Sequence, residues 1–171
     1  MALRLETSRL VLSPVEFADV GALRVLLIHP DVRRWLCDGR VLSEADVRGM
    51  VAQSREAFLW RRAGFFAMRT LHDGSLVGLA GLKPAVLGGP ELVSALWPSL
   101  WRSGLAAEAC RVVLHDAFER VGVQRVLAGA DAPNFRSLAL IHALGFRQIA
   151  ITPGAFGTIR WFSLERPGAT G

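Results

Sequence analysis

The chain has 171 residues and a mass of 18.6 kDa, which is the size of one domain, so we expect residues 1–171 to form a single domain. Hydrophobic residues make up 51% of the chain and charged residues 20%, a balance that supports a sizeable core and excludes a largely disordered protein. The net charge of +5 suits an anionic small molecule as well as a nucleic acid, and because the arginines are scattered we expect no nucleic-acid partner.

The sequence also bears on location and metal content. The longest apolar runs fall short of the roughly 18 residues that a membrane span needs. Charges at Arg4, Glu6 and Arg9 interrupt any signal-peptide core, so we expect a cytoplasmic protein with no membrane partner. The two cysteines, Cys37 and Cys110, lack metal-ligand spacing, and we therefore expect neither a disulfide framework nor a metal site.

Apolar patterning and turn residues predict the elements of the first half of the chain. These are a strand at 9–15, a helix at 16–28 stopped by His29-Pro30-Asp31, a helix from Ser43 to Arg61 or Arg62, a hairpin of strands 64–70 and 76–83, and a strand at 91–97.

The second half begins with a helix at 105–121, which Gly122 ends. A short buried strand at 124–130, a helix at 134–144 and a final hairpin of strands 146–151 and 158–164, joined by the loop 152–157, complete the chain. Helices between strands imply parallel crossovers and hairpins imply antiparallel pairs, so this order predicts an α/β domain built on one mixed sheet of about seven strands with four helices.

Residues 98–104 are the most informative stretch for chemistry. They form a short turn that contains Gly104 and leads from the 91–97 strand into the helix beginning near Leu105. Such a turn aims free backbone N–H groups and the positive end of the helix dipole at one point, a geometry that binds phosphate. The spacing alone does not separate this site from an ordinary helix cap, and it lacks the GxxxxGK[ST] spacing of a nucleoside triphosphate loop.

The surrounding motifs are more specific than the turn alone. The segment Pro98–Ala109 resembles the acyl-CoA-binding motif Q/R-x-x-G-x-G/A of the GNAT N-acetyltransferase superfamily, with Trp101, Gly104 and Ala106 at its defining positions. The stretch Asn134-Phe135-Arg136-Ser137, followed by Leu144-Gly145-Phe146, is similar to the family's second signature, N-x-x-S…L-G-F. The opening Leu5–Leu12 and the turn Gly74–Gly78 resemble the Rim-type branch of ribosomal-protein N-terminal acetyltransferases. The resemblance runs from about residue 3 to 167.

The resemblance implies a mostly antiparallel sheet that splays between its fourth and fifth strands (91–97 and 124–130), where the pantetheine arm of acetyl-CoA enters. Main-chain groups of the fourth strand's end would pair with pantetheine, amides of the following turn would hold the pyrophosphate, and two polar residues of the second signature would contact the pantetheine side. The implied cofactor-binding residues are Leu96, Trp97, Trp101, Arg102, Ser103, Gly104, Leu105, Ala106, Asn134 and Ser137.

The implied reaction is direct attack of a primary amine on the thioester in a ternary complex, achieved mostly by positioning. Glu91, at the head of the fourth strand, would accept the ammonium proton, with Asp131 as the alternative base. Trp35 and Ser94 are the candidate substrate-binding residues. Each of these four residues also has a plain structural interpretation. The glutamate could be a solvated residue at a strand end and the aspartate an ordinary turn residue. The tryptophan could belong to the core, and the serine could simply fill space.

Two departures from the family pattern leave alternatives open. Arg102 stands where the Rim-type branch usually has glycine, and Ile141 stands where many relatives have the tyrosine that protonates the departing thiolate; this chain has no tyrosine. The acid would then be solvent, Ser137 or a group not yet assigned. The alternative function is a non-catalytic acyl-CoA-binding regulatory module, and a homodimer is possible.

No motif in the sequence identifies the acceptor. The resemblance allows a protein N-terminus, an amino acid or polyamine, or an aminated drug, and the loops expected to choose among them are residues 30–42 and 152–157. We expect Cys110, Phe65, Phe66 and Trp161 to pack in the core. The four histidines show no partner pattern of a catalytic triad.

Overall fold

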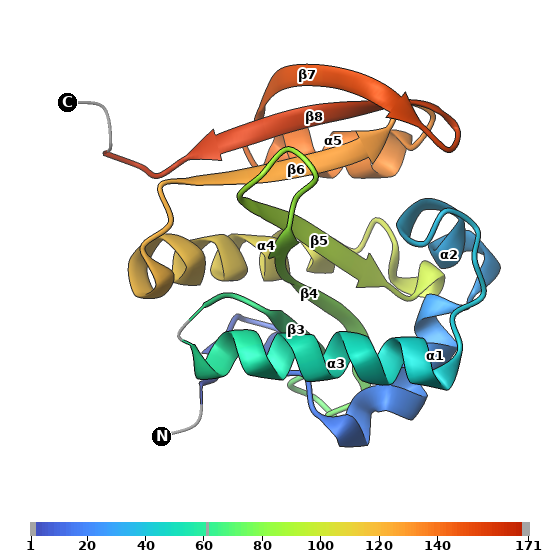
Figure 1. Cartoon of the computed structure of the whole chain (residues 1–171). Helices are drawn as coiled ribbons and strands as arrows, with labels where there is room; N and C mark the ends of the chain where they lie inside the picture. Colours follow the sequence, from blue (N-terminus) through green and yellow to red (C-terminus); the bar gives the residue numbers. More distant parts are fainter. Residues whose placement is uncertain (1–2, 61, 169–171) are drawn as a thin grey trace.

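The computed structural model describes residues 3–60 and 62–168 (Figure 1). Its centre is a sheet of eight strands in the order β1-β2-β3-β4-β5-β6-β8-β7. In chain order the strands are β1 (Leu5–Glu6), β2 (Leu10–Pro14), β3 (Phe65–Thr70), β4 (Leu76–Pro84), β5 (Pro90–Leu96), β6 (Arg125–Asp131), β7 (Arg147–Gly154) and β8 (Gly157–Glu165). The α-helices are α1 (Val20–Leu27), α2 (Pro30–Leu36), α3 (Glu44–Leu59), α4 (Leu105–Asp116) and α5 (Phe135–Ala143). Three shorter helical turns are η1 (Phe17–Asp19), η2 (Pro98–Leu100) and η3 (Ala117–Val121).

The strand pairing confirms the mixed, mostly antiparallel sheet and the splay within it. Every neighbouring pair is antiparallel except β5 and β6, which are parallel and joined by the crossover helix α4. Their only registered pair is Glu91 with Leu127, at the beginning of β5. Beyond that contact β6, β8 and β7 swing away from β5, as Figure 1 shows. The sheet is thus divided into two parts that share one short hinge.

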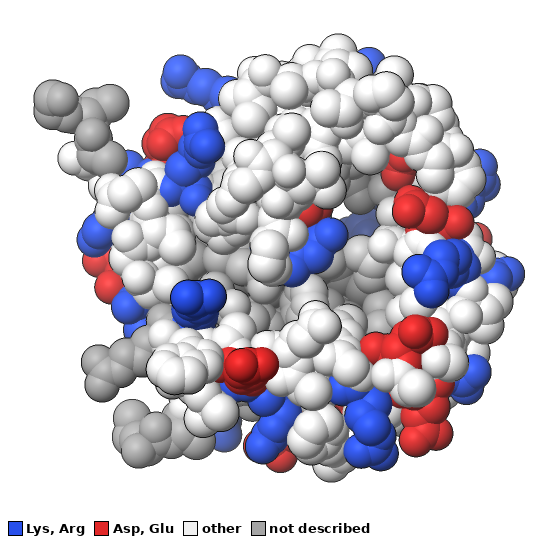
Figure 2. Space-filling model, in the orientation of Figure 1, with Lys and Arg blue, Asp and Glu red and all other residues white. Residues whose placement is uncertain are grey.

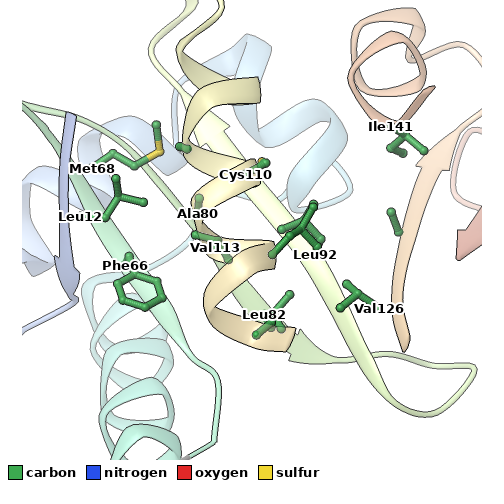
Figure 3. Close-up of a cluster of buried hydrophobic side chains, with 14 of the residues drawn as sticks. Leu12, Phe66, Met68, Ala80, Leu82, Leu92, Cys110, Val113, Val126 and Ile141 are labelled. Carbon is green, nitrogen blue, oxygen red and sulfur yellow. The ribbon is translucent and has the colours of Figure 1, made fainter. Parts of the chain in front are cut away.

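Side chains alternate across the strands, so the sheet has two buried faces. Figure 3 shows the face covered by α4, where Cys110 and Val113 of the helix belong to the same buried cluster as Phe66 and Leu92 of the strands. On the opposite face, α1, α2 and α3 supply the other cluster. The predicted core residues Cys110, Phe65, Phe66 and Trp161 are all buried, which confirms that part of the prediction.

The prediction of a loop at residues 30–42 is wrong. His29-Pro30-Asp31 does end α1, but Pro30 also occupies the first position of α2, where its fixed φ suits a helix and its missing N–H is not needed. The His29 side chain accepts a hydrogen bond from the Asp31 amide and so caps this second helix. A residue that stops one helix has started the next, and Trp35 lies on a helix and not on a loop.

The expected loop at residues 152–157 is also too long. Gly154 pairs with Gly157, so the strands extend to a two-residue turn at Ala155 and Phe156. The sheet gains the short edge strand β1 at Leu5–Glu6, which makes eight strands where about seven were expected. The described residues form five α-helices where four were expected, because α2 was not predicted.

Helix ends also differ in small ways. The regular part of α4 ends at Asp116 and a wider turn, η3, continues to the left-handed Gly122, which ends the helical segment as predicted. Helix α3 ends at Leu59; Arg61, one of its two expected ends, lies outside the described residues. Within residues 3–60 and 62–168, no helix has both the length and the apolar character needed to span a membrane.

Candidate functional site

The divergence of β5 and β6 opens a cleft of about 710 Å³. This volume lies within the range typical of small-molecule and cofactor sites. Figure 2 shows the face onto which the cleft opens, hollowed near its centre, with acidic and basic side chains around the hollow. The lining comes from α2, β5, the turn that follows β5, the first turn of α4, the end of β6 and the beginning of α5. The cleft therefore joins segments that lie far apart in the sequence.

The turn between β5 and α4 has an unusual backbone. Arg102 has a φ of 66° and Gly104 a φ of 82°, both in the left-handed region. Glycine adopts this conformation without cost, whereas a side chain makes it unfavourable by about 1–2 kcal/mol. A Cβ atom on Gly104 would also lie 3.3 Å from the Arg9 guanidinium. The left-handed conformation therefore favours glycine at position 104, and a Cβ atom there would in addition press on the Arg9 guanidinium.

This turn leaves amide groups free to bind an anion. The first hydrogen bond of α4 runs from the Glu108 amide to the Gly104 carbonyl, and the Leu105 amide donates to the Ser103 hydroxyl at 3.3 Å. The amides of Ala106 and Ala107 have no acceptor one turn earlier within the helix, and both residues line the cleft. Together with the helix dipole they form a suitable cradle for a phosphate group.

Trp101 ties this turn to both sides of the cleft. Its indole N–H donates to the Leu96 carbonyl at 3.0 Å, which anchors the turn to the end of β5. The Arg136 guanidinium, from the first turn of α5, lies 4.0 Å above the centre of the indole ring. The Leu96 carbonyl, which the family resemblance assigns to pantetheine, therefore already accepts one hydrogen bond and has one lone pair left.

The cleft brings together most of the residues singled out from the sequence. Those that line it are Trp35, Glu91, Ser94, Leu96, Trp101, Arg102, Gly104, Ala106, Asn134 and Ser137. Trp97, Ser103 and Leu105 do not line it. The Trp97 amide donates to Val77 and its carbonyl accepts from Leu100, so the sheet and η2 already use its main-chain groups. Leu105 is buried in the core cluster beneath α4.

Asn134 and Ser137 form a closed pair at the beginning of α5. The Asn134 carboxamide accepts from the Ser137 amide at 3.2 Å and donates to the Ser137 hydroxyl at 2.8 Å. This is the usual role of asparagine before a helix. Because the Ser137 oxygen acts as an acceptor towards Asn134, its own hydrogen stays available to donate to a ligand in the cleft.

Glu91 stands at the hinge where β5 and β6 still touch. Its side chain is 10% exposed, and the Lys83 ammonium lies 3.4 Å from Oε2 without hydrogen-bond geometry. Burial raises the pKa of Glu91, and the charge of Lys83 opposes that shift only in part. A buried carboxylate with a raised pKa, at the inner end of a cleft, has the properties of a general base.

The lining also includes charged residues that are not among the candidates selected from the sequence, namely Asp31, Asp38, Lys83 and Arg136. Arg136 lies inside the N-x-x-S signature and could have been noticed from that position alone. Asp31 lies in the first turn of α2 and Asp38 follows that helix; both fall within residues 30–42, the segment expected to choose the acceptor, but no motif selected either of them. Asp131, the alternative base, is 6% exposed, and burial followed by the nearby charge of Asp38 raises its pKa. Among the described residues, no group of three or more metal-ligating side chains is found.

The cleft and its motifs agree with comparisons to known proteins. The model of the acetyltransferase (GNAT) domain family matches residues 9–147, more than half of the chain. The uncharacterized N-acetyltransferase p20 of Bacillus licheniformis is 23% identical over 146 residues, which cover 84% of this chain and 82% of that protein.

Two solved structures show the same fold. One, named as a member of the GnaT family of acetyltransferases from Bordetella pertussis, has a TM-score of 0.83 and 24% identity, covering 94% of this chain and 98% of that one. The other is RimL, a ribosomal L7/L12 alpha-N-protein acetyltransferase in complex with coenzyme A, with a TM-score of 0.81 and 14% identity, covering 95% and 98%. At these identities the structures show a common fold and nothing finer.

Proposed function

This chain belongs to the GNAT acetyltransferase domain family, and from that premise we propose that it transfers an acetyl group from acetyl-CoA to a primary amine. The acceptor would be a protein N-terminus or a small-molecule amine. The observation that carries the proposal is the cleft between β5 and β6, which has an anion cradle at one end and a buried carboxylate at the other.

Acetyl-CoA fits the end of the cleft near α4. Its pyrophosphate would accept from the amides of Ala106 and Ala107 at the beginning of α4. Arg102 and Arg136 line the same end and would add positive charge near the phosphates. The pantetheine arm would then lie between β5 and β6, with one lone pair of the Leu96 carbonyl available to an amide of pantetheine.

The chain supplies groups for both proton transfers. Glu91 would accept the proton that the amine loses as its nitrogen forms the C–N bond to the acetyl carbonyl carbon. The C–S bond then breaks, and the departing sulfur needs a proton. The Ser137 hydroxyl, held by Asn134, would give its proton to that sulfur in place of the tyrosine that Ile141 replaces, and would regain a proton from solvent. Most of the rate would come from holding the two substrates together.

A non-catalytic acyl-CoA-binding regulatory module is the second candidate. The observation that favours it is Ile141, which is 5% exposed and carries no proton to give. The buried Glu91 favours catalysis, because a carboxylate kept at a raised pKa costs stability and a module that only binds acyl-CoA does not need it.

We also propose that residues 1–171 work as one acyl-CoA N-acyltransferase domain in the cytoplasm, without metal or nucleic acid. Sedimentation of the purified chain would decide between a monomer and a homodimer.

The test is release of free CoA thiol from acetyl-CoA across a library of primary amines, with mass spectrometry of each product. We expect amine-dependent release and an acetylated product for one class of acceptor. Glu91→Gln should slow release by roughly 10²–10⁴-fold, whereas Glu165→Gln, an exposed substitution of the same type at the end of β8, should not slow it. Acetyl-CoA binding without release for every amine would support the regulatory module instead.

A further inference from the structure

Charge is divided unevenly along the cleft. The end formed by α4 and α5 carries the arginines Arg102 and Arg136. The remaining lining carries four carboxylates and a single ammonium group, from Asp31, Asp38, Glu91, Asp131 and Lys83. Lys83 is already paired with Glu91. The side of the cleft that faces α2 is therefore strongly acidic, although the chain as a whole is basic.

Glu91 and Asp131 occupy opposite ends of this acidic side. Glu91 is level with Leu127 on β6, and Asp131 is four residues further along that strand. Residues 127, 129 and 131 point to one face because side chains alternate, while Ala128 and Ala130 belong to the core beneath α4. At about 3.3 Å per residue, Asp131 lies about 13 Å along the strand from the level of Glu91.

The carboxylate of Asp131 lacks a partner. It is 6% exposed, and within the described part of the chain its Oδ1 atom has no hydrogen bond. A buried acceptor left without a donor is unfavourable, so such a group in a cleft is the natural contact of a ligand that brings a donor. Asp38, in the turn after α2, lies close enough for its charge to act on Asp131. Neither aspartate forms an ion pair within residues 3–60 and 62–168.

We infer that the acceptor is a small amine with a second positive charge, an ammonium or guanidinium group bound between Asp38 and Asp131 while the reacting amine faces Glu91. The inference rests on the proposed function, since it names the substrate class of the same site. A cation there would give Asp131 its missing donor and would offset the repulsion between the two carboxylates. Glu91, with Lys83 beside it, stays free to accept a proton from the other end of the same molecule.

The surroundings of α2 favour a small molecule over a protein chain. Trp35 lines the cleft and its ring meets that of Phe156 edge to face at 5.4 Å, which joins α2 to the turn between β7 and β8. The Arg34 guanidinium lies over the same indole ring, 4.6 Å from its centre. Because Trp35 lines the cleft, we take its contact with Phe156 to border the acidic side and to leave less room for an extended peptide than for a short amine.

The experiment compares aliphatic diamines of increasing length with monoamines of the same length, each as acceptor for the intact chain with acetyl-CoA. The quantity measured is the ratio of kcat/KM for a diamine to that for its matched monoamine, corrected for the two equivalent amino groups. We expect this ratio to exceed about 10 for at least one length, the size of a single charge-assisted hydrogen bond. A ratio near unity at every length would overturn the inference.

Substitutions then locate the second cation. Asp38→Asn and Asp131→Asn should each lower the ratio about tenfold, while Glu56→Gln, which removes an exposed charge from α3 outside the cleft, should leave it unchanged. Asp38 is exposed, so its variant tests the inference even if Asp131→Asn does not fold. If Asp131 were the general base instead, its variant would slow both substrates equally and the ratio would not move, which contradicts the inference.

The outcomes also separate the inference from the proposed function. Transfer to monoamines and diamines alike, or to peptide N-termini in preference to either, would leave the acetyltransferase function standing and overturn the second cation site. Transfer to no amine at all would overturn both.

Discussion

The guanidinium of Arg9 lies 2.7 Å from the Glu108 carboxylate and joins the beginning of β2 to the first turn of α4. The same arginine donates to the Ser103 carbonyl at 2.9 Å, and Glu108 also accepts from the Arg9 amide and from Thr7. Residues near the N-terminus thus fix the turn that contains Gly104 through contacts with Ser103 and Glu108. The structure gives the opening segment, which resembles the Rim-type branch, a role in shaping the proposed acetyl-CoA site.

Arg9→Met should therefore weaken acetyl-CoA binding. The loss of the hydrogen bond to Ser103 frees the turn, and we expect the Kd to rise roughly tenfold, the value of one hydrogen bond to a charged group. Arg4→Met is the control, because among the described residues Arg4 pairs only with exposed Glu6. Calorimetric titration of both variants with acetyl-CoA measures the effect. Equal affinity in Arg9→Met and the parent chain would show that the turn holds its shape without Arg9.

Gly104→Ala tests the turn itself. Alanine at a φ of 82° is unfavourable by about 1–2 kcal/mol, and its Cβ would press on Arg9 at 3.3 Å. Gly74→Ala is the matched control, since Gly74 has a φ of 74° with open space around it in the turn between β3 and β4. We expect both variants to lose thermal stability and only Gly104→Ala to lose acetyl-CoA affinity. A similar affinity for the two variants would mean that the cofactor does not use this turn.

Arg102→Gly should separate backbone conformation from charge. Glycine removes the cost of a left-handed φ of 66°, so we expect the melting temperature to rise or stay level. If the guanidinium pairs with phosphate, acetyl-CoA affinity should fall and depend less on salt concentration. The measurements are thermal unfolding and titration at two ionic strengths. An unchanged affinity at both would place the Arg102 side chain outside the phosphate site.

Glu91→Gln tests the general base through its pH dependence. Burial raises the pKa of Glu91 above the ordinary 4.5, so the deprotonated, active form is lost on acidification at a higher pH than for an exposed glutamate. We expect kcat/KM to fall at low pH as Glu91 becomes protonated. Glu91→Gln should lower kcat by roughly 10²–10⁴-fold and should no longer show this fall in kcat/KM at low pH. If kcat/KM of the variant fell at low pH in the same way as that of the parent chain, another residue would be the base.

The stability of the same variant distinguishes catalysis from structure. Because the folded pKa of Glu91 is raised, the native state binds more protons than the unfolded state, and stability falls as pH increases from about 4.5 through the folded pKa. Above that pKa, a neutral glutamine avoids this cost, so Glu91→Gln should melt no lower than the parent chain at neutral pH. A clear loss of stability there would show that the ion pair with Lys83 supports the fold.

Most of the fold could be predicted because strong local signals carry it. The turn residues around Gly74, the apolar face of α4 and the Asn134 cap each specify their element with little help from the rest of the chain. Helix α2 could not be predicted from the sequence, because a proline is compatible both with the end of one helix and with the beginning of another. The two-residue turn at Ala155 and Phe156 lacks the Asn-Gly or Asp-Gly signal that marks such turns.

The site divides in the same way. Gly104 and Ala106 could be selected because a motif gives them a fixed spacing. Asp38 could not be selected, because its place near Asp131 depends on α2 and on the divergence of β5 and β6, which are tertiary features. The resemblance implies that Trp97, at the end of the 91–97 strand, pairs with pantetheine through its main chain, yet the sheet and η2 use both of its main-chain groups.

The most direct test of the central claim is calorimetric titration of the purified chain with acetyl-CoA, repeated with Gly104→Trp. We predict saturable binding in the micromolar range at one acetyl-CoA per chain, and its loss when the indole fills the turn before α4. No saturable heat with the parent chain, or equal binding by Gly104→Trp, would contradict the assignment of the cleft between β5 and β6 as the acetyl-CoA site.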